Sequence, residues 1–270
     1  MSAGVLTLNV DGKCGKECNC TGGQSIAKLK VSKEPDTPVK GFTKCMHYLE
    51  GGSTFKLNKT LAGDGGTISA TVGSPDAPIP NVTEVSIYYW DGAPDRPILI
   101  GITKKSSSGK PTFYGKNGTG GHLSWLAGQV RDLEEQQALD KQNCYNNDAI
   151  PFNIKDSRTG DFEESKTTCM QKSRKIKSTT SLPDPPPGSE YAVTSFRITD
   201  TSGKDKETKI SRVTYRSKPT DIPPISEAIE KIRLYSYPGS SQVPLMIEFK
   251  PPGNGGSKWY YSANPMVLTG

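Results

Sequence analysis

The stretch Val85-Ser86-Ile87-Tyr88-Tyr89-Trp90 has a copy further along the chain, Ile232-Arg233-Leu234-Tyr235-Ser236-Tyr237. The copies are 147 residues apart, and this offset continues without a gap from Pro97–Ile100 to Pro244–Ile247. A repeat with so long a period indicates two tandem domains, because solenoid repeats are much shorter.

The repeat extends in both directions from this stretch. Phe113-Tyr114 falls on Tyr260-Tyr261 at the same offset, and Leu6–Val10 matches Ile150–Ile154. The copies keep apolar alternation, turn glycines and tyrosines, whereas charged residues and cysteines mostly differ. This pattern is typical of a shared scaffold rather than of a shared catalytic site.

The spacing of apolar residues predicts a mainly β fold with two homologous domains resembling β-sandwiches. The predicted strands are short and separated by turns: Val5–Val10, Ile26–Val31, Thr54–Leu57, Thr67–Val72, Val82–Trp90, Arg96–Thr103 and Thr112–Tyr114, then Ile150–Ile154, Lys175–Lys177, Ala192–Ile198, Thr208–Tyr215, Glu230–Tyr235, Pro244–Phe249 and Lys258–Tyr261. The 28 glycines and 21 prolines suit such a turn-rich architecture.

The pattern changes between the two copies. Residues 123–144 contain no proline and a single glycine, with Leu126, Val130 and Leu133 at helical spacing and Ser124 placed to cap the start. We therefore expect a first β domain over residues 1–122, a junction helix over 123–147 and a second β domain over 148–270. A second copy of this helix would begin at Gly270, which leads us to expect that the natural protein continues.

The composition disfavours several classes of protein. No window approaches the length of an apolar membrane span, and residues 1–4 do not start a basic and apolar leader, so we expect neither a span nor a signal peptide. The net charge of +6 comes from interspersed residues. The basic run Lys166–Lys177, which contains Lys172, Arg174 and Lys175, indicates a solvated strand, with contact to an acidic partner, glycan or nucleic acid as the alternative.

Six cysteines allow two interpretations. In an oxidising compartment they would form disulfides, among which we predict Cys144 with Cys169, the other four pairing within the first domain. Alternatively, a cluster of four cysteines and one histidine could bind zinc or another ligand. Its members are Cys14, Cys18, Cys20, Cys45 and His47.

Catalytic candidates are scarce. The two histidines, His47 and His122, accompany no nucleophile motif. The glycine-rich segment Gly253–Lys258 precedes a predicted strand, whereas a phosphate-binding loop requires a helix. We therefore predict that the protein is not an enzyme and uses no cofactor or metal.

Aromatic residues concentrate on the repeated strands, and alternation should turn about half of them outward. Exposed tyrosine and tryptophan beside basic residues suit binding of a protein, a glycan or single-stranded nucleic acid, while cross-strand stabilisation is the alternative. The predicted binding residues are Tyr88, Trp90, Tyr235, Tyr237, Trp259, Lys172, Arg174 and Lys175.

Several segments resemble a lineage-expanded family of uncharacterised piroplasm parasite proteins, that of Theileria equi in particular. These are Ile87–Trp90, Pro97–Ile100, Phe113-Tyr114 and Leu139–Cys144 followed by Asn146–Ala149. The sequence also resembles, over shorter motifs, the FAINT-type domain class of secreted Theileria proteins. The resemblance covers most of both repeats and provides no catalytic residues.

The resemblance implies secretion or display on the parasite or host-cell surface and a role in host interaction. Together with the repeated scaffold, it leads us to expect a monomeric, non-enzymatic binding module. Its partner would be a host or parasite protein or a glycan, with nucleic acid disfavoured. A zinc or ligand site at the cysteine cluster and a nucleic-acid site at Lys166–Lys177 are the alternatives.

Overall fold

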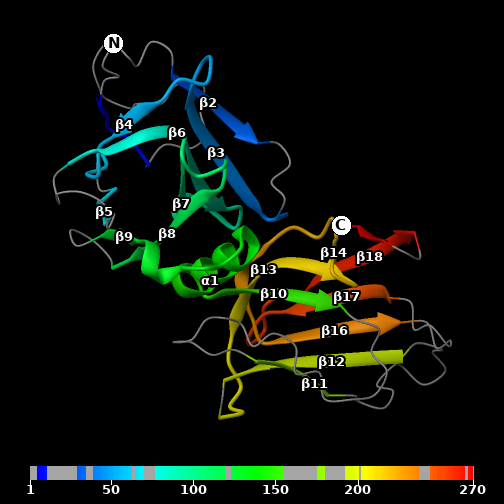
Figure 1. The fold of residues 1–270 in the computed structure, drawn as a ribbon. Coiled ribbons are helices and arrows are strands. Elements are labelled where there is room, and N and C mark those ends of the chain that lie inside the picture. Colours follow the sequence, from blue (N-terminus) through cyan, green and yellow to red (C-terminus); the bar gives the residue numbers. More distant parts are fainter. Residues whose placement is uncertain are drawn as a thin grey trace. The chain divides into compact units, whose positions relative to one another are not determined.

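The computed structural model describes residues 5–10, 29–34, 39–62, 65–69, 77–118, 123–154, 175–179, 192–200, 202–236, 244–264 and 267–269. The chain divides into two compact units, Met1–Gln142 and Asn143–Gly270. The described residues are mainly in strands and contain one α-helix (Figure 1). The predicted mainly β fold is confirmed.

The first unit is built on a nine-stranded sheet. Its strands are β1 (Val5–Leu6), β2 (Leu29–Glu34), β3 (Phe42–Leu49), β4 (Phe55–Leu57), β5 (Thr67–Ser69), β6 (Ile79–Trp90), β7 (Ala93–Lys104), β8 (Pro111–Asn117) and β9 (Ser124–Leu126). The long strand β6 pairs with β4 through its first part, with β3 through its second part, and with β7 on its other side.

This sheet curls back on itself. The strand order runs from β4 through β6, β7, β8 and β9 to β5, and β5 then meets the segment that follows β4 through the bridge between Thr60 and Thr67. The amide of Ile68 donates to the carbonyl of Lys59 over 2.8 Å, and the amide of Leu61 donates to that of Gly66 over 2.9 Å. A ring of hydrogen-bonded strands results.

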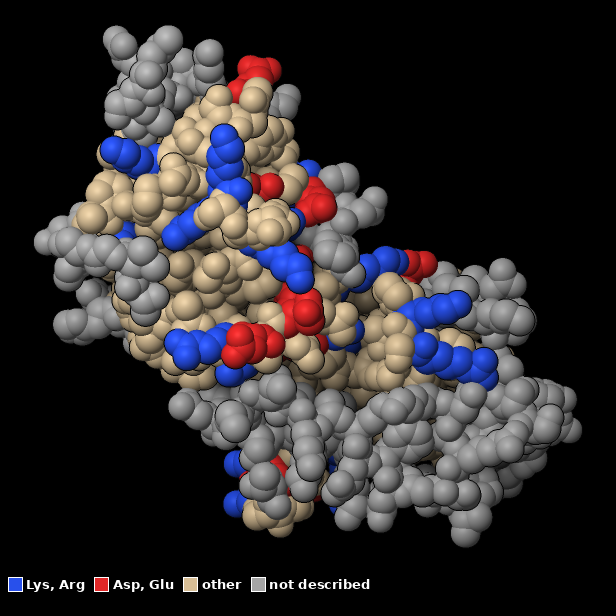
Figure 2. Space-filling view, viewed as in Figure 1, with Lys and Arg blue, Asp and Glu red and all other residues tan. Residues whose placement is uncertain are grey.

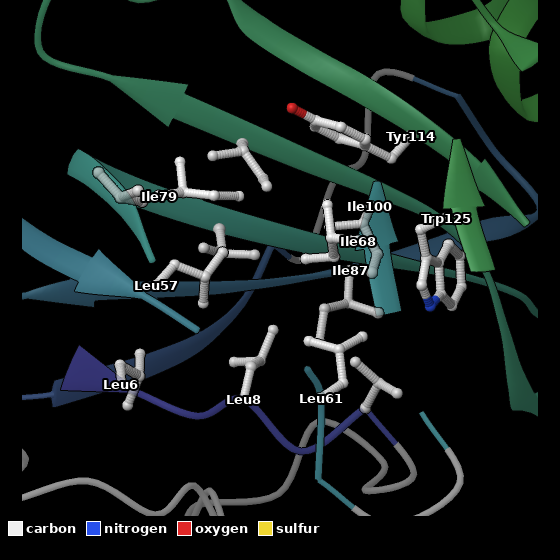
Figure 3. Close-up of a cluster of buried hydrophobic side chains, with 14 of the residues drawn as sticks. Leu6, Leu8, Leu57, Leu61, Ile68, Ile79, Ile87, Ile100, Tyr114 and Trp125 are labelled. Carbon is white, nitrogen blue, oxygen red and sulfur yellow. The ribbon is translucent and has the colours of Figure 1, made fainter. Parts of the chain in front are cut away.

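The ring encloses the first hydrophobic core. Figure 3 shows side chains from its strands converging, among them Leu57, Ile87 and Ile100. Two buried aromatic residues also satisfy their polar atoms, since the Trp125 indole nitrogen donates to the carbonyl of Gly65 over 2.7 Å and the Tyr89 hydroxyl to that of Val10 over 2.9 Å. The ring thus buries apolar surface while these two polar groups keep their hydrogen-bond partners.

The second unit contains two sheets. One has four strands: β10 (Ala149–Ile154), β13 (Thr208–Tyr215), β14 (Lys218–Pro219) and β15 (Ile225–Ile229). The other has six strands in the order β11 (Lys175–Thr179), β12 (Ala192–Thr199), β16 (Lys231–Ser236), β17 (Pro244–Lys250), β18 (Lys258–Asn264) and β19 (Val267–Thr269). One core cluster contains residues of both sheets, and Phe152 of β10 meets Phe196 of β12 with ring centroids 5.2 Å apart.

The two units share one strand order. In the first, β2, β3, β6, β7, β8 and β9 follow one another as β11, β12, β16, β17, β18 and β19 do in the second. The parallel pair of β1 with β4 corresponds to that of β10 with β13. The long strand β6 corresponds to β15 and β16 together, which are separate strands on either side of Glu230.

Cross-strand pairing shows which residues of the two units are equivalent. Ile87 pairs with Ile100 in the first unit as Leu234 pairs with Ile247 in the second, which agrees with the offset of 147. The third strand differs by one position, because Tyr114 faces Ile100 whereas Tyr260 faces Ile247. Phe113 therefore corresponds to Trp259, and the ungapped match of Phe113-Tyr114 to Tyr260-Tyr261 is wrong by one residue.

The predicted junction helix begins much later than expected. The helix α1 spans Glu135–Asn147, and the residues before it form β9 and a 3₁₀ turn over Ala127–Gln129. Trp125 belongs to β9 and is buried in the first core, while Asp132 adopts a left-handed conformation with φ of 60°. Both features are incompatible with a continuous helix from residue 123.

Local hydrogen bonds define both ends of α1. The backbone amide of Glu134 donates to the side chain of Gln137 over 3.1 Å, as in a capping box. The helix ends at Asp148, whose φ is 55° and whose amide donates to the carbonyl of Cys144 over 3.1 Å.

Gly115 of β8 provides a test of how closely α1 packs in the first unit. A Cβ atom there would lie 2.3 Å from Nε2 of Gln142 and 2.9 Å from Cβ of Gln129. We expect Gly115→Ala to lower the free energy of unfolding by about 1 to 3 kcal/mol through this overpacking.

Chemical denaturation would measure the effect, with Gly128→Ala as the matched control because nothing lies within 4 Å of its added Cβ. Adding Gln142→Ala to Gly115→Ala should restore part of the loss. Equal stability of the two glycine variants would contradict the close packing.

Candidate functional site

The face of the β16, β17 and β18 sheet that points away from the second core is the candidate site. These strands lie side by side in Figure 1. Their register aligns Tyr235, Met246 and Tyr261 in one row and Arg233, Glu248 and Trp259 in the next. We call these residues, together with Lys231 and Lys250 in the adjoining row, the outer face.

An aromatic surface covers the β18 side of the outer face. The rings of Tyr235 and Trp259 lie 5.5 Å apart at an interplanar angle of 37°. Trp259 is 51% exposed and Tyr261 is 62% exposed, and Val5 of the first unit is the one other exposed large hydrophobic residue in the described part of the chain. Paired exposure of this kind is unusual, since large apolar side chains on a surface commonly mark interaction sites.

A hydrogen-bonded network fixes the middle of the outer face. Arg233 Nη1 donates to Oε2 of Glu248 over 2.9 Å, and the Ser257 hydroxyl donates to Oε1 over 2.6 Å. Glu248 is only 4% exposed, and both its oxygens are occupied. Burial, followed by the negative charge of Glu248, raises the pKa of the adjacent Tyr235. The guanidinium is thus held in one orientation beside the aromatic rings.

Cations gather at the end of the outer face. Lys231 pairs across the strands with Arg197 of β12 and with Lys250 of β17. Arg197 lies 3.9 Å from Asp205 and Lys250 lies 3.2 Å from Glu230, while Lys231 belongs to none of the ion pairs among the described residues. Burial, and then the neighbouring cations, lower the pKa of Lys231.

The exposed part of this face begins at β16. Val193 and Ser195 of β12 point to the same side but are both buried. The accessible surface therefore widens from β16 towards β18.

The first unit has an equivalent aromatic pair on a face that is covered rather than exposed, which we call the closed face. Tyr88 and Phe113 occupy the positions of Tyr235 and Trp259, with ring centroids 6.2 Å apart. Tyr88 is 0% exposed, and Glu135 at the start of α1 is among the groups that raise its pKa. The helix start thus lies against this face.

Three size changes explain why one face is closed and the other open. Ser86, Gly101 and Gly115 of the first unit correspond to Arg233, Glu248 and Tyr261 of the second. The two glycines leave room beside Phe113 and Gln142. The large residues of the second unit fill that space, so a helix cannot pack on its outer face as α1 packs on the first.

A cluster of ionisable side chains lies beside the closed face. Lys44 Nζ is 3.0 Å from Glu34 Oε2, and Ser86 donates to Glu84 over 2.6 Å. Burial is the main cause that raises the pKa of Glu135 and of Tyr88, whose hydroxyl lies beneath the protein surface. The Tyr88 hydroxyl is sealed from solvent, so this cluster contributes to packing rather than to substrate access.

The predicted binding residues have different outcomes. Tyr235 and Trp259 lie together on the outer face, and their role in binding stays a prediction. Tyr88 and Trp90 are wrong as binding residues, because both are fully buried on the closed face of the first unit. Tyr237, Lys172 and Arg174 lie outside the described residues, and Lys175 begins β11, of which only the backbone is described.

The remaining outer-face residues could be predicted only in part. Arg233, Glu248 and Tyr261 were not predicted, although alternation along β16 to β18 places them on the same side as Tyr235 and Trp259. For Tyr261, the ungapped match of the two repeats hid this, because it made Tyr261 equivalent to the core residue Tyr114. The register shows that Tyr260 is the equivalent of Tyr114 and that Tyr261 points outward.

The charge of the protein is spread rather than concentrated in the view of Figure 2, where basic and acidic side chains alternate on the described surface of the first unit. The basic run Lys166–Lys177 lies largely outside the described residues, so its role as a nucleic-acid site stays a prediction.

The cysteine cluster offers little support for a zinc site. Cys45 and Cys144 are disulfide-bonded rather than free thiols, and a metal-bound cysteine must be a thiolate. Among the described residues no group of three or more potential ligands is placed to hold a metal ion. Cys14, Cys18, Cys20 and Cys169 lie outside them, so the pairing of Cys144 with Cys169 stays a prediction.

His47 is a core residue of the first unit. It is 4% exposed and corresponds to Phe196 of the second core, since His47 faces Val85 as Phe196 faces Ile232. Burial lowers the pKa of His47 to about 4, and hydrogen bonding with the backbone of Val85 and Cys45 offsets this only in part. The imidazole is therefore neutral at physiological pH.

No family model matches the sequence, and neither a curated protein nor a solved structure is significantly similar to it. The described part of the chain contains no helix of the length and apolarity needed to cross a membrane.

The depressed pKa of His47 predicts a loss of stability in acid. The unfolded chain binds a proton near pH 6.5 and the folded chain only near pH 4, so stability is full above pH 6.5 and falls as the pH drops towards 4. Between pH 7 and pH 5 this residue should cost about 2 kcal/mol.

Urea unfolding of the wild type and of His47→Phe at both pH values would measure this difference. Phenylalanine copies the equivalent residue Phe196 and cannot ionise, so the variant should lose about 2 kcal/mol less than the wild type. Parallel pH dependence in the two proteins would show that His47 is not buried in its neutral form.

Proposed function

We propose that the protein is a non-enzymatic binding module that recognises its partner through the outer face of the second unit. The observation that carries the proposal is the exposure of Trp259 and Tyr261 beside the fixed pair of Arg233 and Glu248. The equivalent face of the first unit buries Tyr88 and leaves Phe113 only partly exposed, so the exposure in the second unit is a difference between two copies of one scaffold.

The residue types support binding. Tryptophan, tyrosine and arginine are the residues that most often dominate the energy of protein interfaces. Their rigidity here also matters, because Arg233 is held by Glu248 and Tyr235 packs on Trp259. A preorganised surface loses less conformational entropy when its partner binds.

The chemistry of the outer face supports a non-enzymatic role. Glu248 is the one carboxylate in the two central rows of the outer face. Its oxygens already accept hydrogen bonds from Arg233 and Ser257. An occupied, charge-paired carboxylate is a poor general base. The described residues of this face include neither histidine nor cysteine.

We further propose that the module acts outside the parasite cell or on a cell surface, in contact with the host. The resemblance to piroplasm proteins supports this setting. The disulfide-bonded state of Cys45 and Cys144 also supports an oxidising compartment.

Binding of the fluorescently labelled full chain to red cells and leukocytes tests the proposal. We expect Trp259→Ala to reduce binding by about tenfold or more, since it removes the largest exposed contact of the outer face. Val5→Ala is the matched control, because it shortens an exposed apolar side chain of the other unit.

Both variants should keep the circular dichroism spectrum and thermal midpoint of the wild type. Cell binding that persists unchanged in folded Trp259→Ala protein would refute the outer face as the binding surface.

A further inference from the structure

We infer that the ligand of the outer face is a glycan that carries an acidic sugar. This inference rests on the proposed function and names the chemistry of the partner. It follows from three properties of the face: its flat aromatic surface, its fixed donors and its small net charge.

The aromatic surface suits the apolar face of a sugar ring. Trp259 and Tyr261 belong to one strand and project from the same side of the sheet, with Tyr235 packed against Trp259. Pyranose rings present flat C–H surfaces that pack on aromatic rings, whose electron-rich faces attract the C–H groups. A sheet surface with large exposed side chains provides such a platform without a deep cavity.

The donors suit hydroxyl and carboxylate oxygens. Both oxygens of Glu248 accept hydrogen bonds, from Arg233 and from Ser257, so the donors that this network can offer a ligand are the remaining N–H groups of Arg233, which also interacts with Tyr235. Arg233 remains partly exposed at 31% of its side chain. Lys231, which lies in the adjoining row, adds an ammonium group that forms no ion pair with a described carboxylate.

The charge balance separates an acidic glycan from a nucleic acid. Four cations at this end of the sheet have side chains that the structure describes, and three of them have a carboxylate partner: Arg197, Arg233 and Lys250. Of these four, Lys231 alone forms no ion pair, which suits one carboxylate of a ligand. A nucleic acid brings a phosphate with every nucleotide and would require many more unpaired cations.

A helical protein partner is a poorer match. The first unit shows what the scaffold needs to pack a helix, namely small residues such as Gly101 and Gly115 on the facing strands. Glu248 and Tyr261 replace them in the second unit. Large rigid side chains suit a ligand that lies across them.

Isothermal titration calorimetry with two matched oligosaccharides tests the inference on the full chain. The probes are a hyaluronate tetrasaccharide, in which glucuronate alternates with N-acetylglucosamine, and chitotetraose, which is neutral N-acetylglucosamine throughout. We expect the uronate probe to bind about tenfold tighter, which corresponds to one additional charge-assisted contact. Trp259→Ala should weaken binding of both probes by about tenfold or more.

Lys231→Met should lower the affinity for the uronate probe about tenfold and so remove the preference for it over chitotetraose. Arg197→Met is its matched control, because Arg197 already pairs with Asp205 and should keep the preference. An oligothymidylate probe, titrated at low and high salt, serves as the nucleic-acid arm.

The outcomes separate this inference from the proposed function. Loss of cell binding in Trp259→Ala without binding of either sugar would overturn the glycan and leave the binding face in place. Equal affinity for both sugars would overturn the acidic class, and tight binding of oligothymidylate alone would overturn the glycan. If Trp259→Ala changes neither cell binding nor sugar binding, both proposals are refuted.

Discussion

Apolar alternation on one central pair of strands is the constraint on which each unit depends. Ile87 faces Ile100 in the first unit, and Leu234 faces Ile247 in the second. Because side chains alternate along a strand, a one-residue slip of this pair would turn every core residue to the opposite side. The register is therefore fixed by burial, and it directs Tyr88 and Tyr235 to the other side of their sheets.

The second side of the sheet is where the two units diverged. One side of each sheet must remain apolar to form a core, so changes there are restricted to substitutions such as His47 for Phe196. The other side is free to be covered or exposed. The first unit has glycines and covers it with α1, while the second has Arg233, Glu248 and Tyr261 and presents it to solvent.

The repeat and its apolar periodicity were sufficient to predict the β class and most strands. Strand β3 was missed because two of its core positions are Cys45 and His47, which do not register as an apolar pattern. The start of α1 was missed because Leu126, one of the residues at helical spacing, belongs to strand β9, and that assignment depends on pairing with the distant strand β5.

The candidate site was only half predictable, for a related reason. Tyr88 and Tyr235 are equivalent in sequence, and local pattern cannot tell which of them is exposed. The answer depends on Gly115, whose missing side chain leaves space for Gln142, and on the one-residue change that places Tyr261 opposite Met246. Both are tertiary facts that a single sequence does not encode locally.

The ring closure of the first unit affects how this protein can meet other chains. A strand whose backbone groups are unpaired can recruit another strand, which is a route to aggregation. Joining β5 to the segment after β4 uses those groups internally, and β2, which flanks β3, carries Lys30, Lys33 and Glu34. The same closure that encloses the core thus protects the first unit from sheet-to-sheet association at high local concentration.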